Sequence, residues 1–321
     1  MACTEHKTTG HCAWILVGPT ATGKTAVSNE LARRLGAEVL SADSMLVYRG
    51  MDIGTAKPTA AECAGLVMHG IDLVDPDENF SVGTWLDAAR AAFESAEGRG
   101  RDVVVAGGTG FYVNALLRGI DAPSATDEAL RKKLADLLER GGVDLLRETA
   151  ESLSPGSVAT LSDASNPRRL IRLIEKLSID PNAVASPDGV SCRGRVVVGL
   201  QVEPSILEHR IASRVETMFE SGLLDEVEAL RTSYPNFSET AGKGIGYAEA
   251  LAVIDGILSC AEAMERIVVR TRQLAKRQRT WFRHQLDVEW VPGPVDAHDV
   301  SRAADEVMEV WKRNGKTNVS L

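Results

Sequence analysis

The amino-acid sequence predicts an α/β protein with a parallel sheet flanked by helices and a purely helical segment inserted into it. Short apolar runs alternate with segments of helical periodicity, which is typical of a parallel sheet covered on both faces. A glycine-rich turn joins the first apolar run to the first helical segment. From about residue 121 to residue 187 the pattern is helical only, which indicates an insertion in the α/β core.

The elements of the core follow in order along the chain. The first strand is expected at residues 14–17, where an apolar run ends at Gly18. A helix is expected at residues 24–35, because apolar residues recur there at helical spacing and Gly36 follows them. Three further strands are expected, with helical patterns between them, at residues 38–42, 102–106 and 195–202.

The inserted segment and the C-terminal half add more helices. Inside the insertion, helices are expected at residues 127–140, 143–151 and 166–177, and a linker rich in Pro, Ser, Asp and Gly follows at residues 181–193. Helical periodicity resumes over residues 205–230 and 260–285, whereas the two ends of the chain look loose. The predicted organisation is a discontinuous catalytic core (residues 11–120 and 194–290), a helical insertion domain (residues 121–193) and a C-terminal tail or helix (residues 291–321).

Composition excludes several classes of protein. With 321 residues and 44% hydrophobic residues, the chain can bury a substantial core. The longest apolar runs are far shorter than a membrane span, and residues 1–10 are polar without a signal-peptide pattern, so we expect a cytoplasmic protein with no membrane partner. The five cysteines form no C-x-x-C pair, which argues against a disulfide framework or a zinc site.

The net charge of −9 argues against a nucleic-acid partner, but the charge is unevenly distributed. Residues 266–283 contain basic residues and no acidic one, so that a local basic surface is expected there. These basic residues are Arg266, Arg270, Arg272, Lys276, Arg277, Arg279 and Arg283.

The first turn carries a phosphate-binding motif, GPTATGKT, between a predicted strand and a predicted helix. Its residues are Gly18, Pro19, Thr20, Ala21, Thr22, Gly23, Lys24 and Thr25. Backbone amides at the helix N-terminus would bind a diphosphate, Lys24 would add a positive charge, and the Thr25 hydroxyl would be a ligand for Mg²⁺. This motif predicts a sheet of the P-loop NTPase-like kind, and taken alone it favours a nucleoside triphosphate as the ligand.

Two more polar groups follow predicted strands. Asp43 lies after the second strand, at the sheet edge where open α/β sheets bind ligands, and it is a candidate Mg²⁺ ligand, general base or helix N-cap. Thr109 lies in a Gly-Gly-Thr-Gly turn after the third strand, so its hydroxyl would face the same cleft, although a plain tight turn is an equal alternative.

Together these segments resemble the tRNA dimethylallyltransferase family, also called tRNA isopentenyltransferases. The matching motifs are collinear over residues 14–285 and, beyond the phosphate loop, include ADSMLVYRGMDIGTAKP at 42–58, AGGTGFY at 106–112, NPRRL at 166–170, GIGY at 244–247 and TRQLAKRQRTWFR at 271–283. The tail after residue 288 has no Cys/His cluster, unlike the finger-bearing eukaryotic members, so the resemblance is to the bacterial type.

The resemblance implies transfer of a dimethylallyl group from dimethylallyl diphosphate to N6 of adenosine 37, just 3′ of the tRNA anticodon, giving N6-dimethylallyladenosine and diphosphate. It implies that Asp43 is the base that removes the N6 proton and that Thr109 hydrogen-bonds the bridging oxygen of the leaving group. It further implies that the diphosphate is neutralised by Lys24, Arg214 and Mg²⁺ near Thr25.

The resemblance also implies contacts with the anticodon stem-loop, whose target adenosine has to leave the base stack to reach Asp43. The implied contact residues are Asp43, Ser44, Met45, Leu46, Arg168, Arg169, Arg172, Lys243, Gly246, Tyr247, Lys276, Arg277, Gln278, Arg279, Trp281 and Arg283. Three positions depart from the common pattern, namely Leu46, where many relatives carry Gln, and Lys243 and Ala248.

Three alternatives remain at this stage. A small-molecule kinase with a phosphate loop would leave the basic segment at residues 266–283 unexplained. An adenylate isopentenyltransferase would use the same donor with a free nucleotide, and the helical insertion and basic segment favour RNA over it. A non-enzymatic RNA-binding module would not need the set formed by Lys24, Thr25, Asp43 and Thr109. Nothing in the sequence requires more than a monomer.

Overall fold

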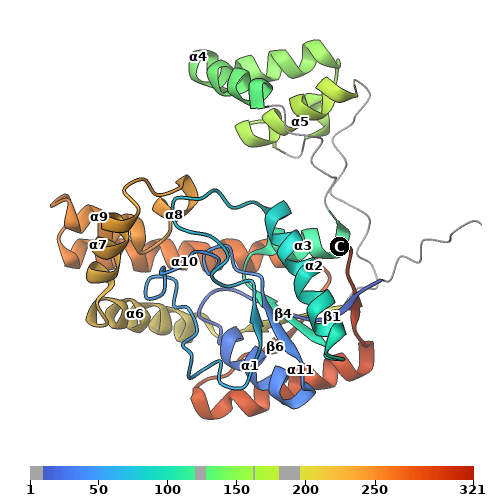
Figure 1. Cartoon of the computed structure of the whole chain (residues 1–321), viewed down its shortest axis with the longest axis vertical. Coiled ribbons are helices and arrows are strands. Elements are labelled where there is room, and N and C mark those ends of the chain that lie inside the picture. The colour runs from blue at the N-terminus through green and yellow to red at the C-terminus, as the bar shows by residue number, and fades with distance from the viewer. Residues whose placement is uncertain (1–9, 120–127, 162, 181–195) are drawn as a thin grey trace, which may run out of the picture. The chain divides into compact units, whose positions relative to one another are not determined.

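The computed structural model describes residues 10–119, 128–161, 163–180 and 196–321. The chain divides into two compact units (Figure 1). Unit 1 comprises the chain up to residue 119 and from residue 192 onward, and unit 2 comprises residues 120–191. The linker expected at residues 181–193 lies outside the described residues.

A parallel sheet forms the centre of unit 1. Its strands lie in the order β3 (Met68–His69), β2 (Glu38–Ser41), β4 (Val103–Gly107), β1 (Cys12–Val17), β5 (Val197–Gln201) and β6 (Val288–Pro292). All of these neighbours pair in parallel, and β7 (Thr317–Asn318) adds to β1 in the antiparallel direction. The structure thus confirms the parallel sheet flanked by helices, and it adds β3, β6 and β7, which the sequence patterns did not indicate.

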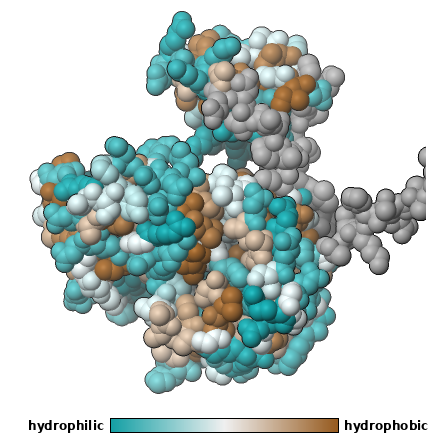
Figure 2. Space-filling view, viewed as in Figure 1, coloured by the Kyte–Doolittle hydropathy of each residue, from teal (hydrophilic) through white to brown (hydrophobic). Residues whose placement is uncertain are grey.

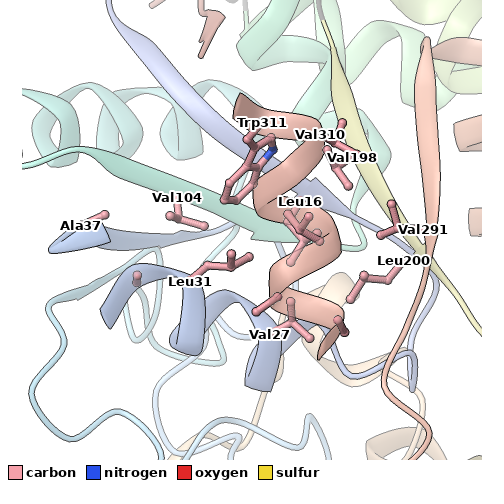
Figure 3. Packing of buried hydrophobic residues seen from close by; sticks show 14 of the residues in the cluster. Leu16, Val27, Leu31, Ala37, Val104, Val198, Leu200, Val291, Val310 and Trp311 are labelled. Carbon is pink, nitrogen blue, oxygen red and sulfur yellow. The ribbon is translucent and has the colours of Figure 1, made fainter. Parts of the chain in front are cut away.

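Helices α1 (Lys24–Leu35) and α11 (Val300–Asn314) cover one face of this sheet. Figure 3 shows Leu16, Val104 and Val198 of the strands packed with apolar residues of both helices. The short helix η2 (Ala297–Asp299) leads into α11, whose Trp311 is buried. The expectation of a loose C-terminal end was therefore wrong, because the apolar face of α11 completes the main core.

Helices α2 (Val82–Gly98) and α3 (Gly110–Arg118) pack against each other and lie near the other face of the sheet. Trp85 of α2 is fully buried and stacks on Tyr112 of α3, with ring centroids 4.8 Å apart. Its indole N–H donates a hydrogen bond of 3.0 Å to the carbonyl of Ser41, at the end of β2. This contact fixes α2 and α3 next to the strand that carries Asp43.

A second group of helices belongs to the same unit: α6 (Pro204–Glu220), α7 (Leu223–Ser233), α8 (Glu239–Gly242), α9 (Tyr247–Ile254) and α10 (Cys260–Gln285). The continuous periodicity of residues 205–230 was misleading, since Gly222, with a φ of 92°, separates α6 from α7. The predicted helix at 260–285 is present as α10, and Ser259 with Glu262 forms a capping box at its start.

All the regular elements among the described residues of unit 2 are helices. It contains α4 (Glu128–Leu153), which is interrupted at Gly142, the short η1 (Val158–Thr160) and α5 (Pro167–Ile179). Leu134, Leu146 and Leu170 belong to an apolar cluster of its own. This agrees with the helical segments expected at residues 127–140, 143–151 and 166–177.

Hydrophilic residues cover much of the face seen in Figure 2, with apolar residues scattered among them. Within the described part of the chain, no helix combines the length and the apolar character that crossing a membrane requires.

Candidate active site

The phosphate loop lies between β1 and α1, as its sequence predicts. Gly23 precedes α1 with a φ of 85°, and Ala21 also has a positive φ of 64°, which is uncommon for a residue with a side chain. The Thr22 hydroxyl stabilises the turn by donating a 2.9 Å hydrogen bond to the carbonyl of Pro19. The loop thus brings its backbone to the N-terminus of α1, where anions bind favourably.

Lys24 begins α1 and turns its side chain back over this loop. Its Nζ donates a hydrogen bond of 2.6 Å to the carbonyl of Pro19. Burial lowers the pKa of Lys24 to about 8, an effect that nearby Asp43 counteracts and nearby Arg214 reinforces. An incoming anion would compensate this cation far better than a single carbonyl does.

The carboxyl ends of β2 and β4 bring Asp43 and Thr109 together. The backbone N–H of Thr109 donates to the carbonyl of Ala42 at 3.0 Å, and the Thr109 hydroxyl accepts a hydrogen bond from the N–H of Ser44 at 3.0 Å. One carboxylate oxygen of Asp43 accepts a hydrogen bond of 2.9 Å from the N–H of Met45. Asp43 and Thr109 are therefore held on two adjacent turns at the same edge of the sheet.

Arg214 on α6 supplies a second partly buried cation. Burial is the main cause that holds the pKa of Arg214 below its usual range, with a further lowering by Arg210 and an opposing effect of Asp43. Arg210 is committed to structure, because its guanidinium donates to the carbonyls of Ala21 and Pro294. For Arg214, in contrast, the described residues provide no ion pair.

Thr25 is the second residue of α1, and its side chain is exposed. Its hydroxyl oxygen and the Asp43 carboxylate are hard oxygen donors of the type that Mg²⁺ prefers, and Mg²⁺ in phosphate sites usually takes few protein ligands. Across the described ranges no cluster of His, Cys, Asp and Glu forms an all-protein metal site. The donor set near the phosphate loop therefore suits a Mg²⁺ ion that arrives with a diphosphate.

Helix α10 is tied directly to both glycine-rich turns. The side-chain amide of Gln278 accepts a hydrogen bond from the N–H of Thr20 at 2.8 Å and donates one to the carbonyl of Gly108 at 3.0 Å. Trp281 lies against Gly110, where an added Cβ would come within 2.1 Å of the indole ring. Sequence analysis assigned Gln278 and Trp281 to RNA contact and did not foresee that they join the helix to the phosphate loop and to the Thr109 turn.

The basic residues of α10 differ in their partners. Arg270 pairs with Glu249 of α9, and Arg272 lies 3.9 Å from Glu208 of α6. The basic surface expected from residues 266–283 is therefore partly neutralised at these two residues, because other helices supply carboxylates there. In the described structure the other five basic residues of the segment have no carboxylate within ion-pair distance: Arg266, Lys276, Arg277, Arg279 and Arg283.

The predicted contact residues at 243–247 lie at the start of α9. Lys243 pairs with Glu239, whereas Tyr247 is fully buried and donates a 2.6 Å hydrogen bond to Glu226. Glu226 also accepts a hydrogen bond of 2.7 Å from the N–H of Ile53, so it ties α7 to the loop after Asp43. Sequence analysis missed Glu226, since nothing in its local pattern distinguishes it from a surface glutamate on α7.

The remaining predicted RNA contacts lie in two places. Ser44, Met45 and Leu46 are half-buried in the turn after β2, next to Asp43. Arg168 and Arg169 are exposed at the start of α5 in unit 2, where the Asn166 side chain caps the helix by accepting hydrogen bonds from their backbone N–H groups. Arg172, one turn later, pairs with Glu175 of the same helix.

Fold and site together define a phosphate-loop α/β protein in which a carboxylate, a hydroxyl and two cations surround an anion-binding turn. Comparison with known proteins specifies the family. The family model described as IPP transferase matches residues 46–285, and the model described as isopentenyl transferase matches residues 12–72. The chain belongs to this family of isopentenyl transferases.

Its relatives carry consistent names. The chain is 40% identical over 278 residues to a tRNA dimethylallyltransferase of Kocuria rhizophila, an alignment that covers 86% of this chain and 88% of the relative. It is 38% identical over 299 residues to the tRNA dimethylallyltransferase of an Anaeromyxobacter species, covering 91% and 98% of the two chains.

Solved structures of similar proteins have the same fold. A tRNA isopentenylpyrophosphate transferase from Bacillus halodurans superimposes with a TM-score of 0.64 at 35% identity, covering 92% of this chain and 98% of that one. A eukaryotic dimethylallyltransferase, captured acting on tRNA, superimposes with a TM-score of 0.71 at 26% identity, covering 94% of this chain and 76% of that one.

Proposed function

We propose that this protein transfers the dimethylallyl group of dimethylallyl diphosphate to N6 of adenosine 37, immediately 3′ of the anticodon in tRNA. The products are N6-dimethylallyladenosine and diphosphate. The C1–O bond of the donor breaks, a C1–N6 bond forms, and one N6 proton leaves to a base. Family membership supports the chemistry, and the arrangement around the phosphate loop supports the roles of individual residues.

One observation carries the assignment of the site: hydrogen bonds from the Thr109 N–H to Ala42 and from the Ser44 N–H to the Thr109 hydroxyl hold Asp43 and Thr109 together at the edge of the sheet. Asp43 also affects the pKa of both Lys24 and Arg214. Direct ion pairs with Asp43 would neutralise both cations. In the described structure, however, neither Lys24 nor Arg214 forms an ion pair with Asp43. The cations are thus available for a diphosphate, and the carboxylate stays available for the acceptor.

Asp43 is suited to be the base. The exocyclic amine of adenine is a poor nucleophile, since its lone pair is delocalised into the ring, so proton removal during C–N bond formation accelerates attack. One oxygen of Asp43 is oriented by the N–H of Met45. The carboxylate has room for four hydrogen bonds, so its second oxygen can accept the N6 proton.

Thr109 is suited to stabilise the leaving group. The bridging oxygen of the diphosphate gains negative charge as the allylic carbon departs, and a preorganised donor there lowers the barrier. The Thr109 oxygen accepts a hydrogen bond from the N–H of Ser44, and its own proton is donated to the Ser44 hydroxyl. Its contact with the Ser44 hydroxyl is long, at 3.3 Å, and a diphosphate oxygen would replace it easily.

The Thr25 hydroxyl would hold Mg²⁺, which would supply charge neutralisation for the leaving diphosphate. Lys24 and Arg214 act on the same negative charge from the protein side. The half-buried position of both cations increases their effect, since the local dielectric constant is lower than that of water.

The cations of α10 that are unpaired in the described structure support the proposal that the acceptor is RNA. Lys276, Arg277, Arg279 and Arg283 would contact tRNA phosphates, and α10 positions them relative to the reaction site through Gln278. We assign the further contacts at residues 43–46, 168–172 and 243–247 to the anticodon stem-loop, and we assign residues 121–193 to an insertion domain that helps to bind it. We also propose that the enzyme modifies tRNA in the cytoplasm, and that it acts as a monomer, because all proposed groups come from one chain.

The test is a transfer assay with Mg²⁺, labelled dimethylallyl diphosphate, and either tRNA or AMP as the acceptor. We expect label in tRNA only, at N6 of adenosine 37 after nuclease digestion. Label in AMP would favour an adenylate isopentenyltransferase. Transfer or hydrolysis of the terminal phosphate of ATP, with no use of the allylic donor, would contradict the proposal and favour a kinase.

A further inference from the structure

A pocket of about 290 Å³ lies in unit 1 beside the phosphate loop, on the β5 side. Its walls come from α6, from α10, from the end of β5 and from the outer part of the loop at Pro19 and Thr22. This volume is at the lower end of the range of small-ligand sites, and therefore fits one compact group.

The pocket shares Pro19 and Thr22 with the phosphate loop but none of the side chains assigned to the chemistry. Ala21 of the phosphate loop, Ile211 of α6 and Ala275 of α10 pack into one buried apolar cluster. Ile211 and Ala275 are also part of the pocket wall. Among the described residues that line the pocket, none is Lys24, Asp43, Thr109 or Arg214. The mechanism above uses the cations of α10 that line the pocket, but it assigns no role to the apolar surface of the pocket.

The lining of the pocket combines aliphatic side chains with the cations of α10. Val202, Pro204, Leu207 and Ile211 supply aliphatic surface, which suits a flat or compact apolar group. Gln201 and Gln273 add side-chain amides that can donate and accept hydrogen bonds. A nucleobase combines these requirements, with an apolar face and polar edges.

The cations point to a polyanion rather than to a single diphosphate. Arg272, Lys276, Arg279 and Arg283 all line the pocket from one face of α10. From the first to the last of them the helix advances about 16 Å, at 1.5 Å per residue. Only Arg272 among these four has a carboxylate near it in the described structure, Glu208 at 3.9 Å. A row of mostly uncompensated cations of this length matches successive phosphates of an RNA strand.

We propose that this pocket receives one further base of the RNA, a loop nucleotide other than the reacting adenosine, while the cations of α10 bind the adjoining phosphates. The inference rests on the proposed function, since it requires an RNA substrate. It assigns to α6 and to the end of β5 a role in RNA recognition that the matching motifs do not include.

The test measures the binding of RNAs that lack one base to the wild-type protein and to a variant whose pocket is filled by a larger side chain. A set of anticodon stem-loop RNAs carries one abasic residue each, at every unpaired position except that of the reacting adenosine. We expect one abasic position to weaken binding to the wild-type protein by on the order of tenfold. Leu207→Trp, which fills the pocket, should weaken binding of the intact RNA by a similar factor. The Leu207→Trp protein should bind the abasic RNA no more weakly than either single change allows.

A second variant protects the test against misfolding. Gln273→Glu places a negative charge at the pocket from an exposed position and should show the same non-additivity with the same abasic RNA. The proposal is overturned if, at every abasic position, the losses of binding free energy from the RNA change and from each protein variant simply add. It is likewise overturned if both variants bind all RNAs as the wild type does. It is also overturned if the variants lose affinity for dimethylallyl diphosphate instead, because the pocket would then belong to the donor.

The failure of this inference is distinguishable from failure of the proposed function. Transfer of label from dimethylallyl diphosphate to intact tRNA by the wild-type protein tests the function. If that transfer occurs while no abasic position is coupled to the pocket, then only the pocket assignment is wrong.

Discussion

The side chain of Gln278 accepts a hydrogen bond of 2.8 Å from the backbone N–H of Thr20, a residue 258 positions away in the chain. The same amide donates to the carbonyl of Gly108. The basic helix α10, the phosphate loop and the turn that carries Thr109 are therefore held by one side chain. This side chain therefore connects the proposed RNA-binding helix to the proposed diphosphate site.

We expect Gln278→Ala to lower the affinity for dimethylallyl diphosphate by about tenfold, because losing the amide leaves two backbone groups of the loops unpaired at a cost of about 1–3 kcal/mol. Isothermal titration calorimetry with the diphosphate donor measures this effect. Thr280→Ala, at an exposed position of the same helix, is the matched control and should bind as the wild type does. Equal affinity of both variants would show that the connection is not needed.

Asp43→Asn should reduce transfer by a factor of about 10²–10⁴, since an amide cannot accept the N6 proton. The remaining amide oxygen can still accept the hydrogen bond from Met45, so tRNA affinity should be nearly unchanged. Single-turnover transfer and filter binding measure the two quantities. Asp87→Asn, on the exposed side of α2, controls for the loss of one charge. Turnover at the wild-type rate would remove Asp43 from its role as the base.

Thr109→Val should slow transfer by about 10²–10³, because it removes the hydroxyl proton expected at the bridging oxygen while preserving the shape of the side chain. Thr109→Ser retains that hydroxyl and should recover most of the rate. The informative readout is the single-turnover rate at saturating tRNA and donor. If valine and serine are equally active, the hydroxyl does not contact the leaving group.

Diphosphate binding should depend on pH through Lys24. In the free protein its pKa is about 8, and a bound diphosphate would raise it. At pH 7, Lys24 is therefore already charged before the diphosphate binds. Near pH 8, binding is accompanied by the uptake of about half a proton. Above pH 8, the affinity for diphosphate falls by up to tenfold for each pH unit. Calorimetry in buffers of different ionisation enthalpy measures this uptake.

Lys24→Arg is the matched variant for this titration, since arginine stays charged over the whole range. It should bind diphosphate without the proton uptake. Uptake of the same size in both proteins would assign the titration to another group.

Lys276→Ala and Arg277→Ala should each weaken tRNA binding and reduce the slope of log K against log salt concentration by about 1, because each removes one phosphate contact. Lys312→Ala, at an exposed position of α11, removes the same charge from another helix and should leave the slope unchanged. An unaltered slope for the α10 variants would place tRNA elsewhere on the protein.

Much of this molecule follows from local patterns. The phosphate motif and helical periodicity predict the helix at residues 24–35, which α1 (Lys24–Leu35) matches at both ends, and the apolar runs locate β1, β2, β4 and β5 within a few residues. The two-residue strands β3 and β7 carry too little pattern to be recognised, and they form because a neighbouring strand offers its free edge.

The sequence by itself determined the parallel α/β class, the anion-binding turn and the positions of Asp43 and Thr109 after their strands, because strand, loop and helix preferences act over a few neighbouring residues. Only the tertiary structure decided that Arg270 is paired with Glu249, that Gln278 joins two distant turns and that α11 completes the core. These outcomes depend on which side chains come into contact after the chain has folded. A contact between residues 258 positions apart cannot be predicted from the local sequence around either of them.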